Sequence, residues 1–540
     1  MPAAVTYGLE VDNKHDVIIL GGGLAGLTLA IQLRRKFPTL NLLVIERRKH
    51  PVPEAAHKVG ESSVEIGAHY FDTVLGLKEH LENQQLRKFG LRYFIYSGVR
   101  QDIEGVTEMG ASRFLPTPSY QLDRGIFENY LTEHARELGA TVVDGGVVRQ
   151  IELGKDGAEH SVRYEVERDG AKQSVQATGR WVVDASGRAG LIKRKLGLAE
   201  DNAHDANAVW FRIGTKIDID EWSTDQRWLT RCDPPLRWLS TNHLMGEGYW
   251  AWLIPLASGS HSVGIVCDAK IHPLETMNTF DKSMDWFRKF QPRLAQELEG
   301  KKHLLQDFCF LRNFSHGCKQ VFSGGDRWAL TGEAGVFLDP FYSPGSDFIG
   351  ISNSYIADLI ARDIGGEHVG GRAKVYQQLY FSFYESTLSL YTDQYPIMGD
   401  PRVMPVKVVW DYAYYWGILC QLFFQNRLTD LASIGALSVE MSHSKALNFA
   451  VQDFMRAWSK VTRKHDVPVM HDQANLPWFA ALNGSLLDTL NEETFRQRIK
   501  DNSKVLNTLA REIVERAKLE CPEVDASAVL KLLEKAQFAA

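Results

Sequence analysis

Cysteine is scarce in this sequence and its charges are nearly balanced, and each feature excludes a class of protein. The six cysteines are scattered without the paired spacing of a zinc site or a disulfide framework, so we expect reduced packing residues and no metal centre. The net charge of −6 gives no general attraction to a polyphosphate backbone, so nucleic acid is not an expected partner. Any basic binding site must be local.

Long uninterrupted apolar runs are also missing. The first run, Val17 to Leu20, follows acidic residues and leads into glycines, whereas a signal peptide has a basic start and a longer apolar core. The longest run, Val408 to Phe424, contains Asp411 and is too short to cross a bilayer, so a buried helix is the better interpretation. We therefore expect a cytoplasmic protein without a transmembrane segment.

The composition that remains is that of an ordinary globular protein. Its 540 residues are too many for one small core and indicate two or three structural units. Apolar residues make up 44% and charged residues 24%, which is unlike a disordered or fibrous chain.

Apolar patterning predicts an α/β fold with a doubly wound sheet. A β-branched strand, Val17 to Leu20, is followed by glycines, by residues with helical spacing and by a second apolar strand, Leu42 to Ile45. This order is the opening unit of a Rossmann-like sheet. Helical spacing dominates after about Asn353. Further strands are expected at residues 93–96, 142–143, 147–151, 163–166, 181–184, 250–254 and 262–267.

The glycines between the first strand and helix fit the dinucleotide-binding pattern G-x-G-x-x-G. Gly21 permits a tight turn, Gly23 lets the backbone approach a pyrophosphate, and Gly26 lets helix and strand pack closely. The phosphates would sit at the helix start beside Leu24 and Ala25, where unpaired N–H groups favour negative charge. The alternative is a glycine-rich turn that binds no ligand. It does not explain why a strand precedes the glycines, a helix follows them and an acidic residue comes at the expected distance.

The acid is Glu46, which lies about 20 residues beyond the last glycine and is placed to accept ribose hydroxyls. Two later segments favour FAD over NAD, namely Asp184 to Arg188 and Thr331 to Gly335. Both resemble sequence marks of the FAD-binding monooxygenase-like superfamily. That superfamily usually has Gly-Asp where this chain has Glu333, so the carboxylate is one methylene further out.

Two more segments resemble the flavin-dependent halogenases. Residues 250–255 read W-x-W-x-I-P, and residues 337–345 read F-x-x-P-x-x-S-x-G. The alternative for the first is a core strand with two tryptophans on one face. The resemblance implies that this strand lies beside the flavin and keeps it from hydroxylating substrate directly. The flavin-adjacent residues would be Trp250, Trp252, Ile254 and Pro255.

In that family reduced FAD, O2 and chloride or bromide give hypohalous acid, which a lysine directs to the substrate. Lys88 is the best match because it follows Glu61 in the family's order, and Lys58 is the rival. An ammonium can polarise the O–X bond, and an amine can instead form a haloamine. The sequence leaves both routes open.

The second motif has Tyr342 where tryptophan halogenases carry a glutamate. This departure resembles halogenases of phenols and pyrroles, whose electron-rich rings delocalise positive charge themselves. The resemblance also implies that Ser343 supports the lysine or halide. The residues expected to contact the cofactor are Gly21, Gly23, Leu24, Ala25, Gly26, Glu46, Ser62, Arg124, Asp184, Glu333 and Gly345.

The resemblance predicts an FAD-dependent halogenase core at residues 1–360, with an interleaved β-rich substrate region, and a helical C-terminal region at 361–540. The aromatic residues of that end are explained mainly by helix packing, and the alternative is a lid over a flat substrate, which a carrier protein could tether. Gly365–Gly366 and Gly370–Gly371 do not follow a strand, so a separate flavin reductase is the expected source of FADH2.

Two other functions compete with this one. The first is an FAD-dependent aromatic hydroxylase of the same fold, which halide-dependent product mass would distinguish. The second is a non-catalytic flavin-binding scaffold, which would give only uncoupled peroxide with reduced FAD.

Overall fold

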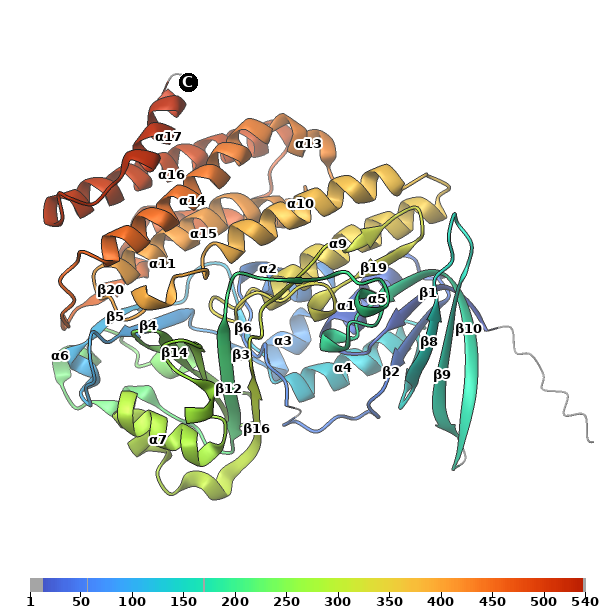
Figure 1. Cartoon of the computed structure of the whole chain (residues 1–540), viewed down its shortest axis with the longest axis horizontal. Helices are drawn as coiled ribbons and strands as arrows, with labels where there is room; N and C mark the ends of the chain where they lie inside the picture. The colour runs from blue at the N-terminus through green and yellow to red at the C-terminus, as the bar shows by residue number, and fades with distance from the viewer. Residues whose placement is uncertain (1–12, 56, 169, 538–540) are drawn as a thin grey trace, which may run out of the picture.

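The structure is a computed structural model that describes residues 13–55, 57–168 and 170–537 (Figure 1). Its first elements are β1 (Lys14–Leu20), α1 (Leu24–Lys36) and β2 (Leu42–Glu46), which confirms the predicted opening unit. β1 pairs in parallel with β2 and with β10 (Ala171–Asp184). Its last four residues have no exposed surface, as is typical of a parallel strand covered on both faces.

β1 lies inside a sheet with the order β18-β19-β10-β1-β2-β7. β9 extends this sheet by antiparallel pairing with β10, and β8 pairs antiparallel with β9. The carboxyl ends of β1, β2, β10 and β19 meet at one edge, where ligands bind in open parallel sheets. The remaining strands of this sheet are β7 (Thr141–Asp144), β8 (Val147–Glu152), β9 (His160–Arg168), β18 (Phe322–Ser323) and β19 (Trp328–Leu330).

A second sheet, mostly antiparallel, has the order β16-β12-β15-β14-β13-β4-β5-β20. β14 (Tyr249–Pro255) lies near its centre between β13 (Thr241–Gly246) and β15 (His261–Asp268). All residues of β14 are buried, so this strand is inside the molecule. The other strands are β4 (Leu91–Ile95), β5 (Thr107–Gly110), β12 (Ala206–Ile213), β16 (Leu305–Leu311) and β20 (Met470–Asp472).

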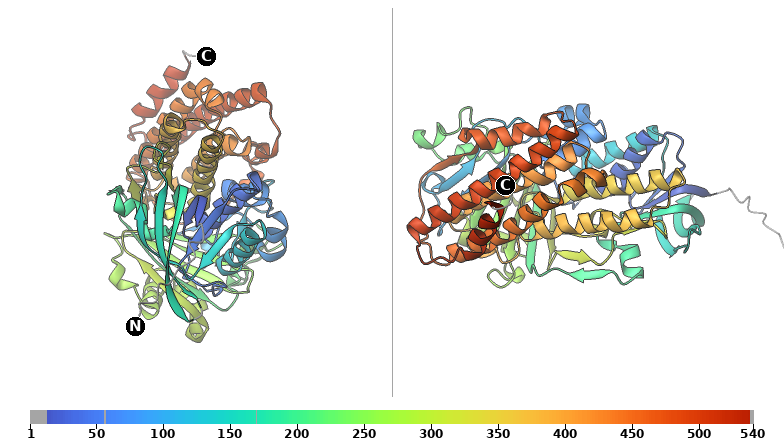
Figure 2. Two further views of the ribbon diagram at one scale, coloured as in Figure 1. Left: turned by 90° about the vertical axis from the view of Figure 1, so that its right-hand side faces the viewer. Right: turned by 90° about the horizontal axis from the view of Figure 1, so that it is seen from above.

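Long helices form a layer that lies across both sheets along one side of the molecule (Figures 1 and 2). α11 and α14 pack on each other and on α16, which is consistent with the predicted helical end. The layer begins at residue 345, slightly before the expected start near Asn353. Its main helices are α9 (Gly345–Ile364), α10 (Gly370–Leu388), α11 (Val403–Tyr414), α14 (Ser438–Ser459) and α16 (Glu492–Glu520).

The helical layer shares its hydrophobic core with the first sheet. Tyr355 of α9 and Trp410 of α11 are fully buried in the same cluster as Val17. The boundary expected at residue 360 falls inside α9, and the division into two units stays a prediction.

The apolar run 408–424 is a buried helical segment, as predicted. It consists of the end of α11, a π-helical turn (Tyr415–Cys420) and α12 (Gln421–Phe424). Among the described residues, no helix combines the length and the apolar character that crossing a membrane requires.

Candidate active site

A cavity of about 620 Å³ opens at the carboxyl edge of the first sheet, where the second sheet meets it. Its size is within the range of ligand sites in proteins. We call it the large cavity. Of the expected site residues it is lined by Gly21, Gly23, Leu24, Ala25, Glu46, Ser62, Arg124, Trp250, Trp252, Ile254, Glu333, Ser343 and Gly345.

The glycine turn forms one end of this cavity, and each glycine has a distinct environment. A Cβ at Gly21 would lie 2.4 Å from the carbonyl oxygen of Ala185, and a Cβ at Gly26 would lie 1.9 Å from that of Gly21. A Cβ at Gly23 would meet only Lys58, with its Nζ 3.9 Å away. Backbone packing therefore leaves no room for a side chain at Gly26. The space beside Gly23 is open toward the cavity, where a diphosphate could approach the backbone closely.

Glu46 forms hydrogen bonds to the backbone at the glycine turn and just after β2. Its carboxylate accepts hydrogen bonds from the backbone N–H of Gly22 at 2.7 Å and of Arg48 at 2.8 Å. The side chain also lines the cavity, and a carboxylate has about four acceptor positions, so it has capacity for a ribose hydroxyl.

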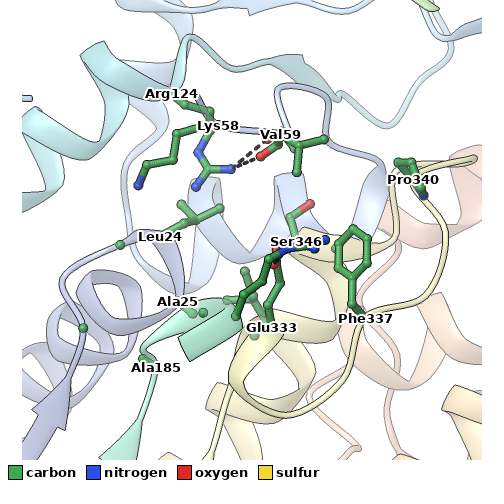
Figure 3. A pocket seen from close by; sticks show the side chains of 18 of the residues that line it. Leu24, Ala25, Lys58, Val59, Arg124, Ala185, Glu333, Phe337, Pro340 and Ser346 are labelled. Atoms are coloured by element: carbon green, nitrogen blue, oxygen red, sulfur yellow. Dashed lines mark hydrogen bonds and ion pairs between the residues drawn. The ribbon is translucent and has the colours of Figure 1, made fainter. Parts of the chain in front are cut away.

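Two cations lie beside the open space at Gly23. Lys58 and Arg124 both form ion pairs with the buried Glu128. Arg124 also donates to the carbonyl oxygen of Val59 at 2.7 Å (Figure 3). Burial lowers the pKa of Lys58, and Glu128 opposes that shift. These positions suit an anionic cofactor group, and they place Lys58 at the glycine turn.

The carboxylates of Asp184, at the end of β10, and of Glu333, after β19, differ in whether they line the large cavity. Asp184 has no exposed surface, and its carboxylate accepts hydrogen bonds from the N–H groups of Ser186 and Ile192 at 3.0 and 2.7 Å. It does not line the large cavity, and instead holds a turn that does. Glu333 lines the cavity and accepts a hydrogen bond from Arg188 at 3.0 Å.

Strand alternation explains which residues of β14 face the cavity. Trp250, Trp252 and Ile254 alternate along the strand and line the cavity, whereas Pro255 has the opposite parity and does not. The two indoles lie 5.6 Å apart between ring centroids. A Cβ at Gly264, which faces Trp252 across β14 and β15, would lie 2.2 Å from that ring, so a glycine is needed there.

The segment 341–345 forms a sharp turn before α9. Tyr342 and Ser343 have φ values of 67° and 56°, a left-handed conformation that side chains other than glycine seldom adopt. As a result the two neighbours face different spaces. Ser343 lines the large cavity, and Tyr342 lines a second, smaller one.

This second cavity, of about 60 Å³, has five tyrosines among its lining residues, and we call it the tyrosine cavity. Pro344 and Phe348 line both cavities, so the start of α9 separates them. The members of its wall that can form hydrogen bonds through side chains are Tyr342, Asp347, Ser386, Thr387, Tyr391, Asp411, Tyr412, Tyr414 and Tyr415.

Lys88 lies in the wall region between the two cavities and lines neither. Pairing of β3 (Leu86–Arg87) with β6 (Tyr120–Gln121) fixes its backbone. Its ammonium nitrogen donates to the Ser62 hydroxyl at 2.9 Å and to the Ser63 carbonyl at 2.6 Å. Burial lowers the pKa of Lys88 to about 7, although Glu65 and Asp347 oppose this. Ser62 faces the large cavity and Asp347 the tyrosine cavity, so Lys88 is in contact with one wall and electrostatically linked to the other.

Several charged or titratable residues that line the two cavities are not among the site residues expected from the sequence. His243 of β13 lines the large cavity, and burial lowers its pKa to about 3, which keeps it neutral. Glu61 also lines it, and burial raises its pKa to about 7. Asp411 lines the tyrosine cavity. The sequence marked Asp411 as a carboxylate inside an apolar run and Glu61 as the residue that Lys88 follows, but it predicted neither as part of the site.

Comparison with known proteins finds relatives of this chain. Residues 14–276 match the family described as FAD binding domain. A flavin-dependent halogenase of Dictyostelium discoideum is 26% identical over 464 residues, which cover 78% of this chain and 74% of the relative. A chlorinase of pyrrole-2-carbonyl groups on a peptidyl-carrier protein, from Pseudomonas fluorescens, is 27% identical over 62% of this chain and 73% of its own.

The fold is also similar to a solved structure, that of halogenase PltM. The two superpose with a TM-score of 0.66 at 17% identity, covering 96% of this chain and 99% of PltM. The chain is therefore an FAD-dependent oxidoreductase, and the large cavity is the candidate site for the dinucleotide. Within that class it is related to the flavin-dependent halogenases, which confirms the resemblance given by its two motifs.

Proposed function

We propose that this enzyme halogenates an electron-rich aromatic ring, phenolic or pyrrolic, with chloride or bromide and reduced FAD. The observation that supports the proposal is the position of Lys88. A buried lysine held between the cofactor cavity and a tyrosine-lined cavity is in the position to transfer an electrophilic halogen from one to the other. FAD, when bound and reduced, supplies the oxygen chemistry that converts halide to hypohalous acid.

The residues of the large cavity hold and isolate the cofactor. Gly23, Lys58 and Arg124 receive its diphosphate, and Glu46 receives a ribose hydroxyl. Trp250 and Trp252 form a buried wall that limits access to the reacting end. Ser343, in its left-handed turn, places its hydroxyl and the following backbone toward the same space.

Lys88 acts on hypohalous acid, and its hydrogen bonds determine which of its N–H donors remains available for this. An ammonium has three N–H donors, and Ser62 and Ser63 take two of them. The third polarises the O–X bond toward the ring. The haloamine route would instead use the neutral amine, and the two routes differ in their pH dependence.

Tyr342 supports the choice of substrate. A neutral phenol at this position cannot stabilise a ring cation as a carboxylate at the same position would, so we expect the ring to supply electron density through a hydroxyl or pyrrole nitrogen. Relatives are consistent with both options: one is named for pyrrole-2-carbonyl on a carrier protein, and PltM has been solved in complex with phloroglucinol and FAD. A carrier-bound substrate is therefore compatible with the proposal.

The test is a competition with the purified chain, FAD, a separate flavin reductase, NADH and bromide. Equimolar phenols, pyrroles and tryptophan are supplied, and products are read by the bromine isotope doublet. Brominated phenol or pyrrole should exceed bromotryptophan by a wide margin. Predominant bromotryptophan would contradict the substrate class, and hydroxylated products without halogen would identify a hydroxylase.

Variants of the two lysines test which of them is catalytic. Lys88→Ala should lower halogenation by at least about 10²-fold and leave FAD affinity intact, because the ammonium acts after the cofactor has reacted. Lys58→Ala should weaken FAD affinity, because Lys58 lies at the glycine turn. The assignment fails if Lys88→Ala keeps its turnover and Lys58→Ala loses halogenation at saturating FAD.

A further inference from the structure

The tyrosine cavity contains a buried charged network that the proposed function does not yet use. Asp411 of α11 accepts hydrogen bonds from the hydroxyl of Tyr342 and the ammonium of Lys407, each at 2.8 Å. Its second oxygen accepts from the amide of Gln452 at 2.6 Å, and that amide's oxygen accepts from Lys407 at 2.7 Å. Asp411 and Lys407 are only 2% and 1% exposed.

Three donors surround the Asp411 carboxylate, namely the Tyr342 hydroxyl, the Lys407 ammonium and the Gln452 amide. The pair lies on one face of α11 at i and i+4. The chain thus has a carboxylate in the substrate region, but it comes from the helical layer and reaches the cavity beside Tyr342.

The hydroxyl of Tyr342 connects this carboxylate to the cavity. It donates its one proton to Asp411, so its oxygen is left as a hydrogen-bond acceptor. Burial and the Asp411 charge raise the pKa of Tyr342 well above its ordinary value, so Tyr342 does not itself become a stable anion. Such a hydroxyl can accept one hydrogen bond while it donates another.

We propose that Tyr342 and Asp411 form a proton relay that ionises the hydroxyl of a phenolic ring in the tyrosine cavity. This inference rests on the proposed halogenase function and narrows it to phenols, because a pyrrole N–H is far less acidic. The substrate O–H bond breaks, its proton passes to the Tyr342 oxygen, and the Tyr342 proton passes to Asp411. The products are a phenolate and a carboxylic acid, with no change of oxidation state.

The later steps restore the relay. The phenolate ring carbon takes the halogen of hypohalous acid with its electron pair, and hydroxide leaves. Hydroxide recovers the proton of Asp411 through Tyr342 and becomes water, so Asp411 is again an anion. The halogenated carbon then gives its proton to the ring oxygen, which completes the substitution.

The relay is tested with Tyr342→Phe and Asp411→Asn on a series of phenols of graded acidity. Both variants should lower kcat by about 10²-fold or more on phenols that are un-ionised at the assay pH. The loss should shrink to a few-fold on nitrophenols, which are already ionised, and for each phenol as the pH passes its own pKa. FAD affinity and hypohalous acid production, measured by trapping with a free β-diketone, should not change.

The matched control is Tyr376→Phe. Tyr376 donates to Asp358 at 2.5 Å, so it is a tyrosine–aspartate pair of the same kind, and neither residue lines either cavity. Its kcat should equal that of the unmodified enzyme on every phenol. Tyr342→Phe keeps the pair of Asp411 and Lys407, so it remains informative if Asp411→Asn does not fold.

Two results would overturn the relay. One is an equal loss in Tyr342→Phe on all phenols at every pH, which would mean that Tyr342 only positions the ring. The other is full activity in Tyr342→Phe. Failure of the proposed function looks different, because the unmodified enzyme would then form no halogenated product from any substrate.

Discussion

At the scale of single residues, the protonation state of Lys88 separates the two routes of halogen transfer. Burial lowers the pKa of Lys88 to about 7, so the residue is an ammonium below that pH and an amine above it. If the ammonium polarises hypohalous acid, the yield of halogenated product per hypohalous acid formed should be highest below pH 7 and should fall as the pH rises through 7. Parallel measurement of product and trapped hypohalous acid gives this ratio.

The control is Lys88→Arg, because a guanidinium stays charged throughout the range. Whatever activity it retains should not fall near pH 7. A yield that rises through pH 7 in the unmodified enzyme would instead identify the haloamine route.

Gly23 and Gly26 have separate roles that substitution distinguishes. At Gly23 a side chain meets open space, so Gly23→Val should leave the free energy of unfolding within about 0.5 kcal/mol and abolish FAD binding. At Gly26 a side chain overlaps backbone, so Gly26→Val should cost about 3 kcal/mol of stability. Denaturant unfolding and flavin titration measure the two effects. An unchanged titration in Gly23→Val would show that the diphosphate binds elsewhere.

At the scale of elements, β14 depends on the strand beside it. A methyl group at Gly264 would lie 2.2 Å from the Trp252 ring, so Gly264→Ala should displace the indole that lines the large cavity. We expect a loss of about 1–3 kcal/mol of stability and weaker FAD binding. Gly325→Ala is the control, because nothing lies within 4 Å of its Cβ. Equal stability and FAD affinity in the two variants would show that the position of Trp252 does not depend on a glycine at position 264.

The elements themselves could be predicted wherever local periodicity decides them. β1, α1, β2 and β14 follow from apolar spacing and the glycine motif. Of the four residues of β14 that the resemblance placed beside the flavin, Pro255 does not line the large cavity. The π-helical turn at Tyr415–Cys420 had no such signal, since it depends on tertiary packing.

The site was less predictable because its contacts are distant along the chain. Asp411 is visible in the sequence as a carboxylate within an apolar run, but its partner Tyr342 is 69 residues away. The left-handed turn at Tyr342 and Ser343 is equally hidden, because neither residue type favours that conformation. The prediction that a strand ends at Asp184 is confirmed. Its carboxylate, however, accepts hydrogen bonds from the turn that follows and does not face the large cavity.

At the scale of the whole molecule, the source of electrons is open to a direct test. Within residues 13–55, 57–168 and 170–537, Gly365–Gly366 and Gly370–Gly371 lie at helix ends and do not follow a strand. We therefore expect FADH2 from a separate reductase, and little oxidation of NADH or NADPH by the purified chain. A reductase behind a dialysis membrane that passes free flavin should still support halogenation. Rapid bleaching of bound flavin by NADPH alone would instead indicate a one-component enzyme.

The turn at residues 341–345 also sets a rule for engineering this enzyme. Tyr342 and Ser343 are neighbours that serve different cavities, and Gly345 begins the helix that separates those cavities. Adding or deleting one residue between Pro340 and Gly345 would exchange or misdirect the two side chains. Libraries that aim at new substrates should therefore vary the identity of residue 342 and keep the length of this segment fixed.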